Sequence, residues 1–258
     1  MNRINQVFAN GKAFIPFITA GYPSIETTEH MIIRMAENGA DLIELGIPFS
    51  DPTAEEQVIQ DANIRALAGG VTVDKIFDML KRVRKTCSVP IVFMTYANPV
   101  FAYDPDKFLS RCKEVRVDAL FIPDLPFEEK EEFLPYCSKY DIFLISMVAP
   151  SSKDRIHMIA EGAQGFVYCV PSMEELSKDK ELVCDVKEMV RLVKETQDIP
   201  CVVGLGNSSF EKAAEAAAFS DGVIVSGDMM NIVERYGKDC VPYAAEYVAT
   251  MKKKIQSV

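Results

Sequence analysis

One carboxylate lies inside a strongly apolar stretch of the chain. Glu44 stands in the run Leu42-Ile-Glu-Leu-Gly46. Burying a carboxylate there is costly unless the group is paired or used, and desolvation raises its pKa. A carboxyl group that titrates near neutral pH suits proton transfer, so Glu44 is a candidate acid or base. The alternative is a structural carboxylate held by backbone donors.

Further acids follow in the loop after Glu44. Residues 47–57 read Ile-Pro-Phe-Ser-Asp-Pro-Thr-Ala-Glu-Glu-Gln, so Glu55 and Glu56 lie close to Glu44 in sequence. If either faced the same cavity as Glu44, the two carboxylates would form an acid–base pair. The alternative is that these acids are solvated, or that they cap a helix beginning near Gln57.

Two glycine-containing runs late in the chain are candidates for anion binding. They read Gly204-Leu-Gly-Asn-Ser-Ser and Ser226-Gly-Asp-Met-Met. Glycine lets backbone N–H groups approach an anion, and a helix N-terminus adds a positive dipole. Asp228 opposes this interpretation, because it would bring a negative charge to the anion, although Asp is also an ordinary helix N-cap.

Polar side chains also follow two apolar runs in the middle of the chain. Tyr96 and Asn98 follow residues 90–94, and Asp124 ends the run 119–123 within Pro-Asp-Leu-Pro. Such groups can orient a ligand or can satisfy the backbone of a loop, and the sequence leaves both possibilities open.

Eight short apolar runs are the elements that must position these residues. Most are continuously apolar, which is typical of parallel strands covered on both faces. The predicted strands are residues 14–19, 41–45, 90–94, 119–123, 142–148, 165–170, 200–204 and 222–226.

Amphipathic stretches with helical spacing alternate with these runs. The predicted helices are residues 27–37, 73–83, 182–196, 210–218 and 230–254, the last long enough for one or two helices. Strict alternation in 258 residues predicts an α/β fold, a single (β/α)8 TIM barrel over residues 1–258. No G-x-G-x-x-G follows the first strand, which disfavours dinucleotide binding. In such barrels the chemistry lies at the carboxyl ends of the strands, where the candidate residues stand.

Composition narrows the functional classes. A net charge of −10 argues against binding to nucleic acid or to an anionic membrane. No apolar run approaches the ~20 residues of a spanning helix, and the first residues lack a signal-peptide core. Seven scattered cysteines without a C-x-x-C pair indicate reduced thiols and a cytoplasmic protein. A metal site is not expected, since His30 and His157 are the two histidines and neither has a cysteine at ligand spacing.

Four motifs in order resemble one family, the tryptophan synthase α-subunits. The longest is Glu44-Leu-Gly-Ile-Pro-Phe-Ser-Asp-Pro52. The others are Phe14-Ile-Pro-Phe-Ile-Thr-Ala-Gly-Tyr-Pro23, Met94-Thr-Tyr-Ala-Asn-Pro99 and Ile122-Pro-Asp-Leu-Pro126. The resemblance covers nearly the whole chain.

The resemblance implies a lyase that cleaves indole-3-glycerol phosphate to indole and glyceraldehyde 3-phosphate without a cofactor. Glu44 matches the family's catalytic glutamate, and Glu55 matches its second carboxylate. The residues expected to bind the substrate are Phe17, Ile59, Tyr96 and Tyr168 around the indole, Gly206, Gly227 and Asp228 at the phosphate, and Asp124. The implied partner is a β-subunit that carries pyridoxal phosphate, in an α2β2 assembly.

The sequence departs from the family's pattern around the expected substrate. Glu56-Gln57 replaces Gly-Pro after the second carboxylate, and Asp228 replaces a serine at the phosphate. The active-site lid, residues 171–178, lacks the family's Gly-Val-Thr-Gly motif, and by spacing Leu176 and Ser177 stand in its Thr and Gly positions. A carboxylate near a phosphate dianion is unfavourable unless neutralised.

These departures keep a second hypothesis open. The chain is either a lyase of this type with weakened activity, or an impaired or repurposed relative that binds a β-subunit or another indole-like ligand. A generic phosphate-binding isomerase barrel would need a different acid–base constellation, and a scaffold is compatible with the same fold.

Overall fold

Nine parallel strand segments form one sheet that curves into a barrel. The computed structural model describes residues 3–171 and 182–258. The strands are β1 (Ala13–Thr19), β2 (Ile43–Gly46), β3 (Ile91–Met94), β4 (Ala119–Phe121), β5 (Phe143–Leu144), β6 (Ser146–Val148), β7 (Val167–Cys169), β8 (Cys201–Leu205) and β9 (Gly222–Val225). They lie in the order β5-β4-β3-β2-β1-β9-β8-β7-β6.

A single interrupted strand closes the ring. β5 pairs with β4 and β6 pairs with β7, and only Ile145 separates β5 from β6. The Ile145 N–H donates to the Leu120 carbonyl at 2.8 Å, which continues the ladder to β4. The nine segments therefore occupy eight strand positions, and the predicted TIM barrel is confirmed.

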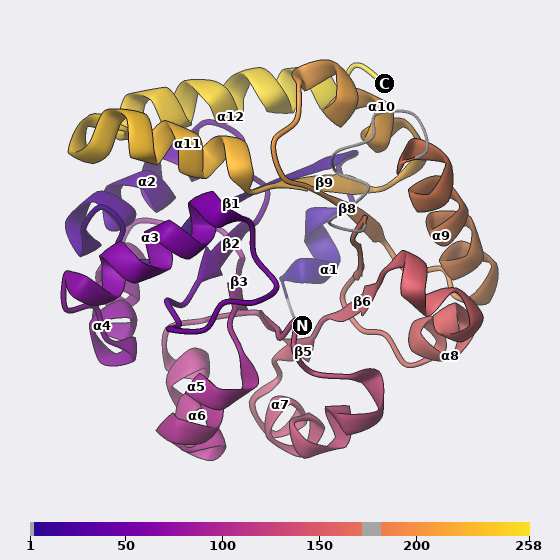
Figure 1. Ribbon diagram of the computed structural model, residues 1–258, viewed down its shortest axis with the longest axis horizontal. Helices are drawn as coiled ribbons and strands as arrows, with labels where there is room; N and C mark the ends of the chain where they lie inside the picture. The colour runs from indigo at the N-terminus through magenta and orange to yellow at the C-terminus, as the bar shows by residue number, and fades with distance from the viewer. Residues whose placement is uncertain (1–2, 172–181) are drawn as a thin grey trace.

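Helices surround the ring of strands (Figure 1). They are α1 (Ile4–Val7), α2 (Ile25–Glu37), α3 (Gln57–Ala68), α4 (Val73–Val83), α5 (Ala97–Tyr103), α6 (Pro105–Glu114), α7 (Leu134–Tyr140), α8 (Ile156–Glu161), α9 (Leu182–Thr196), α10 (Phe210–Phe219), α11 (Gly227–Tyr236) and α12 (Val241–Ile255). Three 3-10 helices, η1 (Phe127–Glu132), η2 (Pro150–Arg155) and η4 (Gly237–Asp239), complete the described elements.

Continuous apolar runs explain the strands. All seven residues of β1 are buried, because one face packs on helices and the other fills the barrel. Local signals set the helix ends: the Ser24 hydroxyl accepts from the Thr27 N–H at 3.1 Å at the start of α2. The predicted stretch 230–254 is two helices, because Gly237 adopts φ +56° at the end of α11 and Pro242 lies in the first turn of α12.

The short first helix and the residue before it pack at the amino-terminal ends of the strands. The Arg3 guanidinium donates to Asp118 at 2.8 and 2.9 Å and to the Ser88 carbonyl at 2.6 Å, just before β4 and β3. Ile4 is fully buried and lies against Gly165, just before β7. This end is closed by packing, which leaves the carboxyl ends of the strands for a cavity.

The predicted strands, the cysteines and the membrane expectation can also be compared with the structure. Each of the eight predicted strands is present, with ends that differ from the prediction by two residues at most, and the predicted strand 142–148 is divided into β5 and β6. Six cysteines are free and buried, as expected of small hydrophobic residues: Cys87, Cys112, Cys137, Cys169, Cys201 and Cys240. Within the described ranges, no helix combines the length and the hydrophobicity needed to cross a membrane.

Candidate active site

A cavity of about 360 Å³ opens at the carboxyl ends of the strands. Most of its lining comes from strand ends and from the loops that follow them, as the barrel rule predicts. The described residues around it are Phe17, Glu44, Ala54, Glu55, Glu56, Ile59, Met94, Phe121, Pro123, Met147, Ala149, Pro150, Ser151, Tyr168, Val170, Pro171, Gly204, Leu205, Gly206 and Ser226. Three carboxylates are among them, and no lysine, arginine or histidine.

Glu44 projects into this cavity from the middle of the barrel wall. It is the second residue of β2, in register with Phe17 of β1 and Val92 of β3, and it is 3% exposed. Burial raises its pKa to about 8, and the charge of Glu55 contributes to the increase. Glu44 is therefore mostly protonated at neutral pH and can act as an acid.

Glu55 reaches the same cavity from the loop between β2 and α3. Asn63 of α3 donates from Nδ2 to Glu55 Oε2 at 2.8 Å. Burial raises the Glu55 pKa to about 7, while hydrogen bonds with Asn63 and Tyr96 act in the opposite direction by stabilising the charged form. At neutral pH, Glu44 and Glu55 thus form a pair in which one carboxyl is mostly protonated and the other is half ionised.

Asn63 organises the loop that carries Glu55, and sequence reasoning did not identify it. Its Oδ1 accepts from the Phe49 N–H at 2.9 Å while its Nδ2 donates to Glu55, and the side chain is buried. Tyr96 supports the same loop, because its hydroxyl accepts from the Ala54 N–H at 3.1 Å. An amide side chain on the helix that follows a predicted active-site loop is the sequence signal that could have indicated Asn63.

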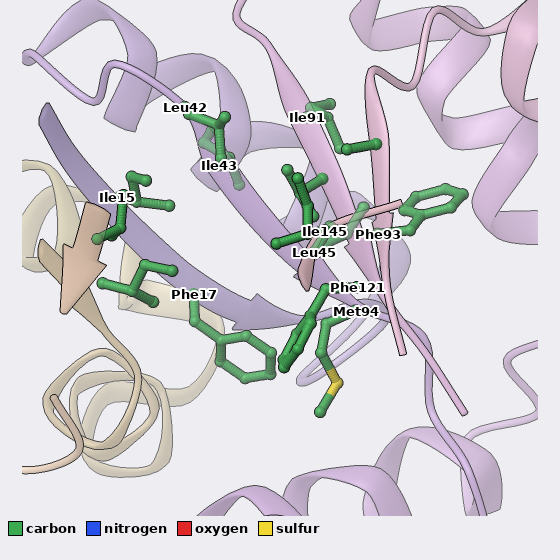
Figure 2. Close-up of a cluster of buried hydrophobic side chains, with 14 of the residues drawn as sticks. Ile15, Phe17, Leu42, Ile43, Leu45, Ile91, Phe93, Met94, Phe121 and Ile145 are labelled. Carbon is green, nitrogen blue, oxygen red and sulfur yellow. The ribbon is translucent and has the colours of Figure 1, made fainter. Parts of the chain in front are cut away.

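Aromatic rings form the apolar wall of the cavity. The Phe17 ring packs on Gly46 of β2, where an added Cβ would lie 2.7 Å from the ring. Tyr168 of β7 packs in the same way on Gly204 of β8, and its ring centroid is 4.8 Å from that of Phe121. Figure 2 shows Phe17, Phe121 and Met94 close together near the ends of their strands. This wall suits a flat apolar ring.

The last two strands form the other end of the cavity, which we call the anion cup: Gly206, Asn207, Ser226 and Gly227. Gly206 follows β8, and Gly227 begins α11, with its Cα packed against Asn207. The N-terminus of α11 supplies unpaired backbone N–H groups and the positive end of a helix dipole. Small residues and a helix N-terminus are the elements that a phosphate requires.

A carboxylate already lies in this cup. An added Cβ on Gly206 would be 1.6 Å from Glu56 Oε1, so the carboxylate occupies the space next to the glycine. Asn207 Nδ2 approaches Glu56 Oε2 at 3.4 Å. Burial raises the Glu56 pKa, and Asp228 contributes further. The sequence indicated that Glu56 could face the cavity of Glu44, but not that it would point at the anion cup.

Three predicted site residues, Tyr96, Asp124 and Asp228, do not line this cavity. Asp228 Oδ2 accepts from the Ser208 N–H at 2.8 Å and from the Tyr247 hydroxyl at 3.2 Å, so donors surround its charge. Asp124 Oδ1 accepts from the Ala97 N–H at 3.0 Å. The Tyr96 hydroxyl contacts the loop of Glu55 at the Ala54 N–H. Of the other predicted residues, Phe17, Glu44, Glu55, Ile59, Tyr168 and Gly206 line the cavity, and Gly227 adjoins it at Asn207.

The predicted lid lies almost entirely outside the described residues. Pro171 lines the cavity, whereas Leu176 and Ser177 fall within residues 172–181. Met94, Phe121 and Met147 were missed as lining residues. The first two are the last residues of β3 and β4, so their position at strand ends is the signal that could have found them.

The fold and the cavity together define a (β/α)8 barrel with an acid–base pair at the carboxyl ends of its strands. The family model described as "Tryptophan synthase alpha chain" matches residues 4–257, and the chain belongs to this family. The tryptophan synthase alpha chain of Lacticaseibacillus casei is 42% identical over 246 residues, covering 95% of this chain and 92% of the relative. That of Caldanaerobacter subterraneus is 44% identical and covers 92% of both.

Solved structures agree with this assignment. The tryptophan synthase subunit alpha from Legionella pneumophila superposes with a TM-score of 0.89 at 33% identity over 100% of both chains. A chain of tryptophan synthase from Mycobacterium tuberculosis, in an open form, gives a TM-score of 0.88 at 29% identity over 99% of both chains.

Proposed function

We propose that this chain cleaves indole-3-glycerol phosphate to indole and glyceraldehyde 3-phosphate as the lyase subunit of tryptophan biosynthesis. The observation that carries the proposal is the pair of buried carboxylates, Glu44 and Glu55, beside an aromatic wall that ends in an anion cup. The wall accommodates the indole ring, and the cup accommodates the phosphoryl group.

The reaction needs one acid and one base in this cavity. Protonated Glu44 donates a proton to indole C3, and ionised Glu55 stabilises the positive charge that develops at the ring nitrogen. The bond between C3 and the glycerol chain then breaks, and its electrons return to the indole ring. The neighbouring hydroxyl becomes the aldehyde and gives its proton to the Glu44 carboxylate, which restores the starting state.

The pKa values of about 8 for Glu44 and about 7 for Glu55 match these two roles. A carboxyl group whose pKa lies near the pH of the reaction can both donate a proton and take it back with little free-energy cost. None of these steps calls on a cofactor, in keeping with the expectation that pyridoxal phosphate belongs to the β-subunit.

The structural relatives include chains of tryptophan synthase assemblies, which supports a β-subunit as partner. We propose an α2β2 assembly in the cytoplasm, with the whole chain acting as one barrel domain. Mixing the chain with a cognate β-subunit in sedimentation-velocity experiments tests the stoichiometry. A complex of another mass, or none, would contradict it.

Indole release from indole-3-glycerol phosphate, with and without the β-subunit, tests the function directly. We expect release by the wild type and a large loss in Glu44→Gln. Glu215→Gln is the matched control, because Glu215 is an exposed residue of α10 and the substitution is chemically the same. Release that is unaffected by Glu44→Gln would overturn the proposed mechanism.

The second candidate is a relative that binds an indole-like ligand without a phosphoryl group. Glu56 in the anion cup favours it, because the carboxylate competes with a phosphate dianion for the same place. A folded protein that releases no indole but binds indole in calorimetric titrations would support this candidate over the lyase.

A further inference from the structure

The loop between β2 and α3 aims two successive carboxylates at different ends of one cavity. Glu56 is extended, with φ −66° and ψ 157°, and extended backbone sends successive side chains to opposite sides. Glu55 accordingly meets Asn63, while Glu56 meets Gly206. Glu56 is also the residue before α3, yet its side chain makes no cap hydrogen bond to that helix.

We propose that Glu56 is a specificity-determining residue whose carboxylate is the internal occupant of the anion cup, so that a phosphoryl group binds only after Glu56 is neutralised or withdrawn. The inference rests on the proposed function, since it concerns the phosphoryl end of the same substrate. Its observation is independent, because it depends on the contact of Glu56 with Gly206 and Asn207 and not on Glu44 or Glu55.

Space is the first argument. A Cβ on Gly206 would lie 1.6 Å from Glu56 Oε1 and 2.6 Å from the carboxyl carbon. These atoms lie where a ligand would have to approach the Gly206 backbone. A phosphoryl group and the Glu56 carboxylate therefore cannot both occupy the cup.

Charge is the second argument. The groups around Glu56 are Asp228 on α11, Glu55 next to it in the loop, Tyr168 on β7 and the Asn207 amide. The cavity has no basic side chain in the part of the chain that the structure describes. Asn207 contacts Glu56 through a neutral amide at 3.4 Å, which does not cancel the charge of the carboxylate. Burial, with a contribution from Asp228, raises the Glu56 pKa. Proton uptake by Glu56 thus accompanies binding of a phosphate dianion.

Asn207 connects Glu56 to helix α11. Its Oδ1 accepts from Asn231 Nδ2 of α11 at 2.6 Å, while its Nδ2 faces Glu56. Its backbone N and its Oδ1 would also lie 2.9 and 2.7 Å from a Cβ on Gly227. Withdrawal of Glu56 leaves the Asn207 amide N–H free to donate to the incoming phosphoryl oxygen.

Titration calorimetry with sn-glycerol 3-phosphate, and with indole as an uncharged probe, tests the proposal. We compare the wild type with Glu56→Gln, Glu56→Gly and the control Glu215→Gln at pH 6 and pH 8. We expect both Glu56 variants to bind glycerol 3-phosphate about tenfold more tightly at pH 8, with a smaller gain at pH 6 where Glu56 is more often neutral. Indole affinity should stay within twofold in every variant.

Two results would overturn the inference. One is glycerol 3-phosphate affinity that is unchanged or weaker in both Glu56 variants, which would mean that the carboxylate moves aside without penalty or assists binding. The other is absence of phosphate binding in all variants. Failure of the proposed function is distinguishable, because it would appear as no indole release while the affinity gain in Glu56→Gln and Glu56→Gly remains.

Discussion

Glu55 and Glu56 carry the same functional group on adjacent residues, but their surroundings differ. Glu55 is 6% exposed, accepts from Asn63 and lies beside a second carboxyl, Glu44. Glu56 is half-buried and lies against Gly206 and the Asn207 amide. The surroundings therefore distinguish two chemically identical side chains: Glu55 is held by a donor beside a second carboxyl, whereas Glu56 fills the space beside Gly206.

The largest expected effect comes from the acid–base end. Glu44→Gln should lower the turnover of indole-3-glycerol phosphate by about 10²–10⁴-fold, because the amide cannot transfer the proton to C3. Steady-state indole release checks this. The Michaelis constant should change little, since the Gln side chain has nearly the same size. A fall of less than about tenfold would remove Glu44 from the role of acid.

Neutralising Glu55 and neutralising Glu56 should have opposite effects on the reaction. Glu55→Gln should decrease turnover by about 10²-fold, because the charge that stabilises the ring nitrogen is lost. Glu56→Gln should instead lower the Michaelis constant by about tenfold at pH 8, because the neutral amide removes the repulsion between the Glu56 carboxylate and the phosphate dianion. Steady-state kinetics of the two variants, measured side by side, give both constants. Equal losses of turnover in Glu55→Gln and Glu56→Gln would contradict the difference between the two residues.

Asn63 donates a hydrogen bond to Glu55, and this contact distinguishes Glu55 from Glu56. Asn63→Ala removes the 2.8 Å hydrogen bond that holds the Glu55 pKa down against burial. We expect about a tenfold loss of turnover at pH 7 and an acidic limb of the pH–rate profile that moves to higher pH. A merely structural role would reduce activity without moving that limb.

The wild-type pH profile of kcat/KM should be narrow. Glu55 must be ionised, so activity falls as pH drops below about 7, and Glu44 must be protonated, so activity falls as pH rises above about 8. In Glu55→Gln the residual activity should keep its alkaline limb, shifted to lower pH because Glu55 no longer raises the Glu44 pKa. A profile that is flat between pH 6 and 9 would contradict both assignments.

The last prediction concerns stability. The Glu44 pKa is raised from 4.5 to about 8, so the folded state holds this proton more tightly than the unfolded state. The free energy of unfolding therefore decreases as pH rises from about 4.5 to about 8. Glu44→Gln should be more stable than the wild type at pH 8.5, by about 1.4 kcal/mol for each unit of pKa shift at most, and equal to it near pH 4. Urea unfolding at both pH values measures the difference.

The chain itself accounts for most of the barrel and for part of the site. Continuous apolar runs predict each strand because parallel strands are buried on both faces, and Ser24 marks the start of α2. Helices α5 to α8 were not predicted. They are short, and in α5, α6 and α7 prolines at or near the start (Pro99, Pro105 and Pro135) interrupt the periodic pattern that indicates a helix.

Glu44 could be identified from sequence because an acid in an apolar strand is a local anomaly, and its neighbours in the chain already predict burial and a raised pKa. The partners of Glu55 and Glu56 are not local. Asn63 lies about two helical turns beyond the loop, and Gly206 lies 150 residues beyond Glu56 in the chain. Which carboxylate receives a donor and which one enters the anion cup depends on how α3, β8 and α11 meet around the cavity. The sequence determined the barrel and the acid in its wall, and the tertiary structure decided the role of each neighbouring glutamate, because hydrogen-bond partners and excluded volume exist only once the ring has closed.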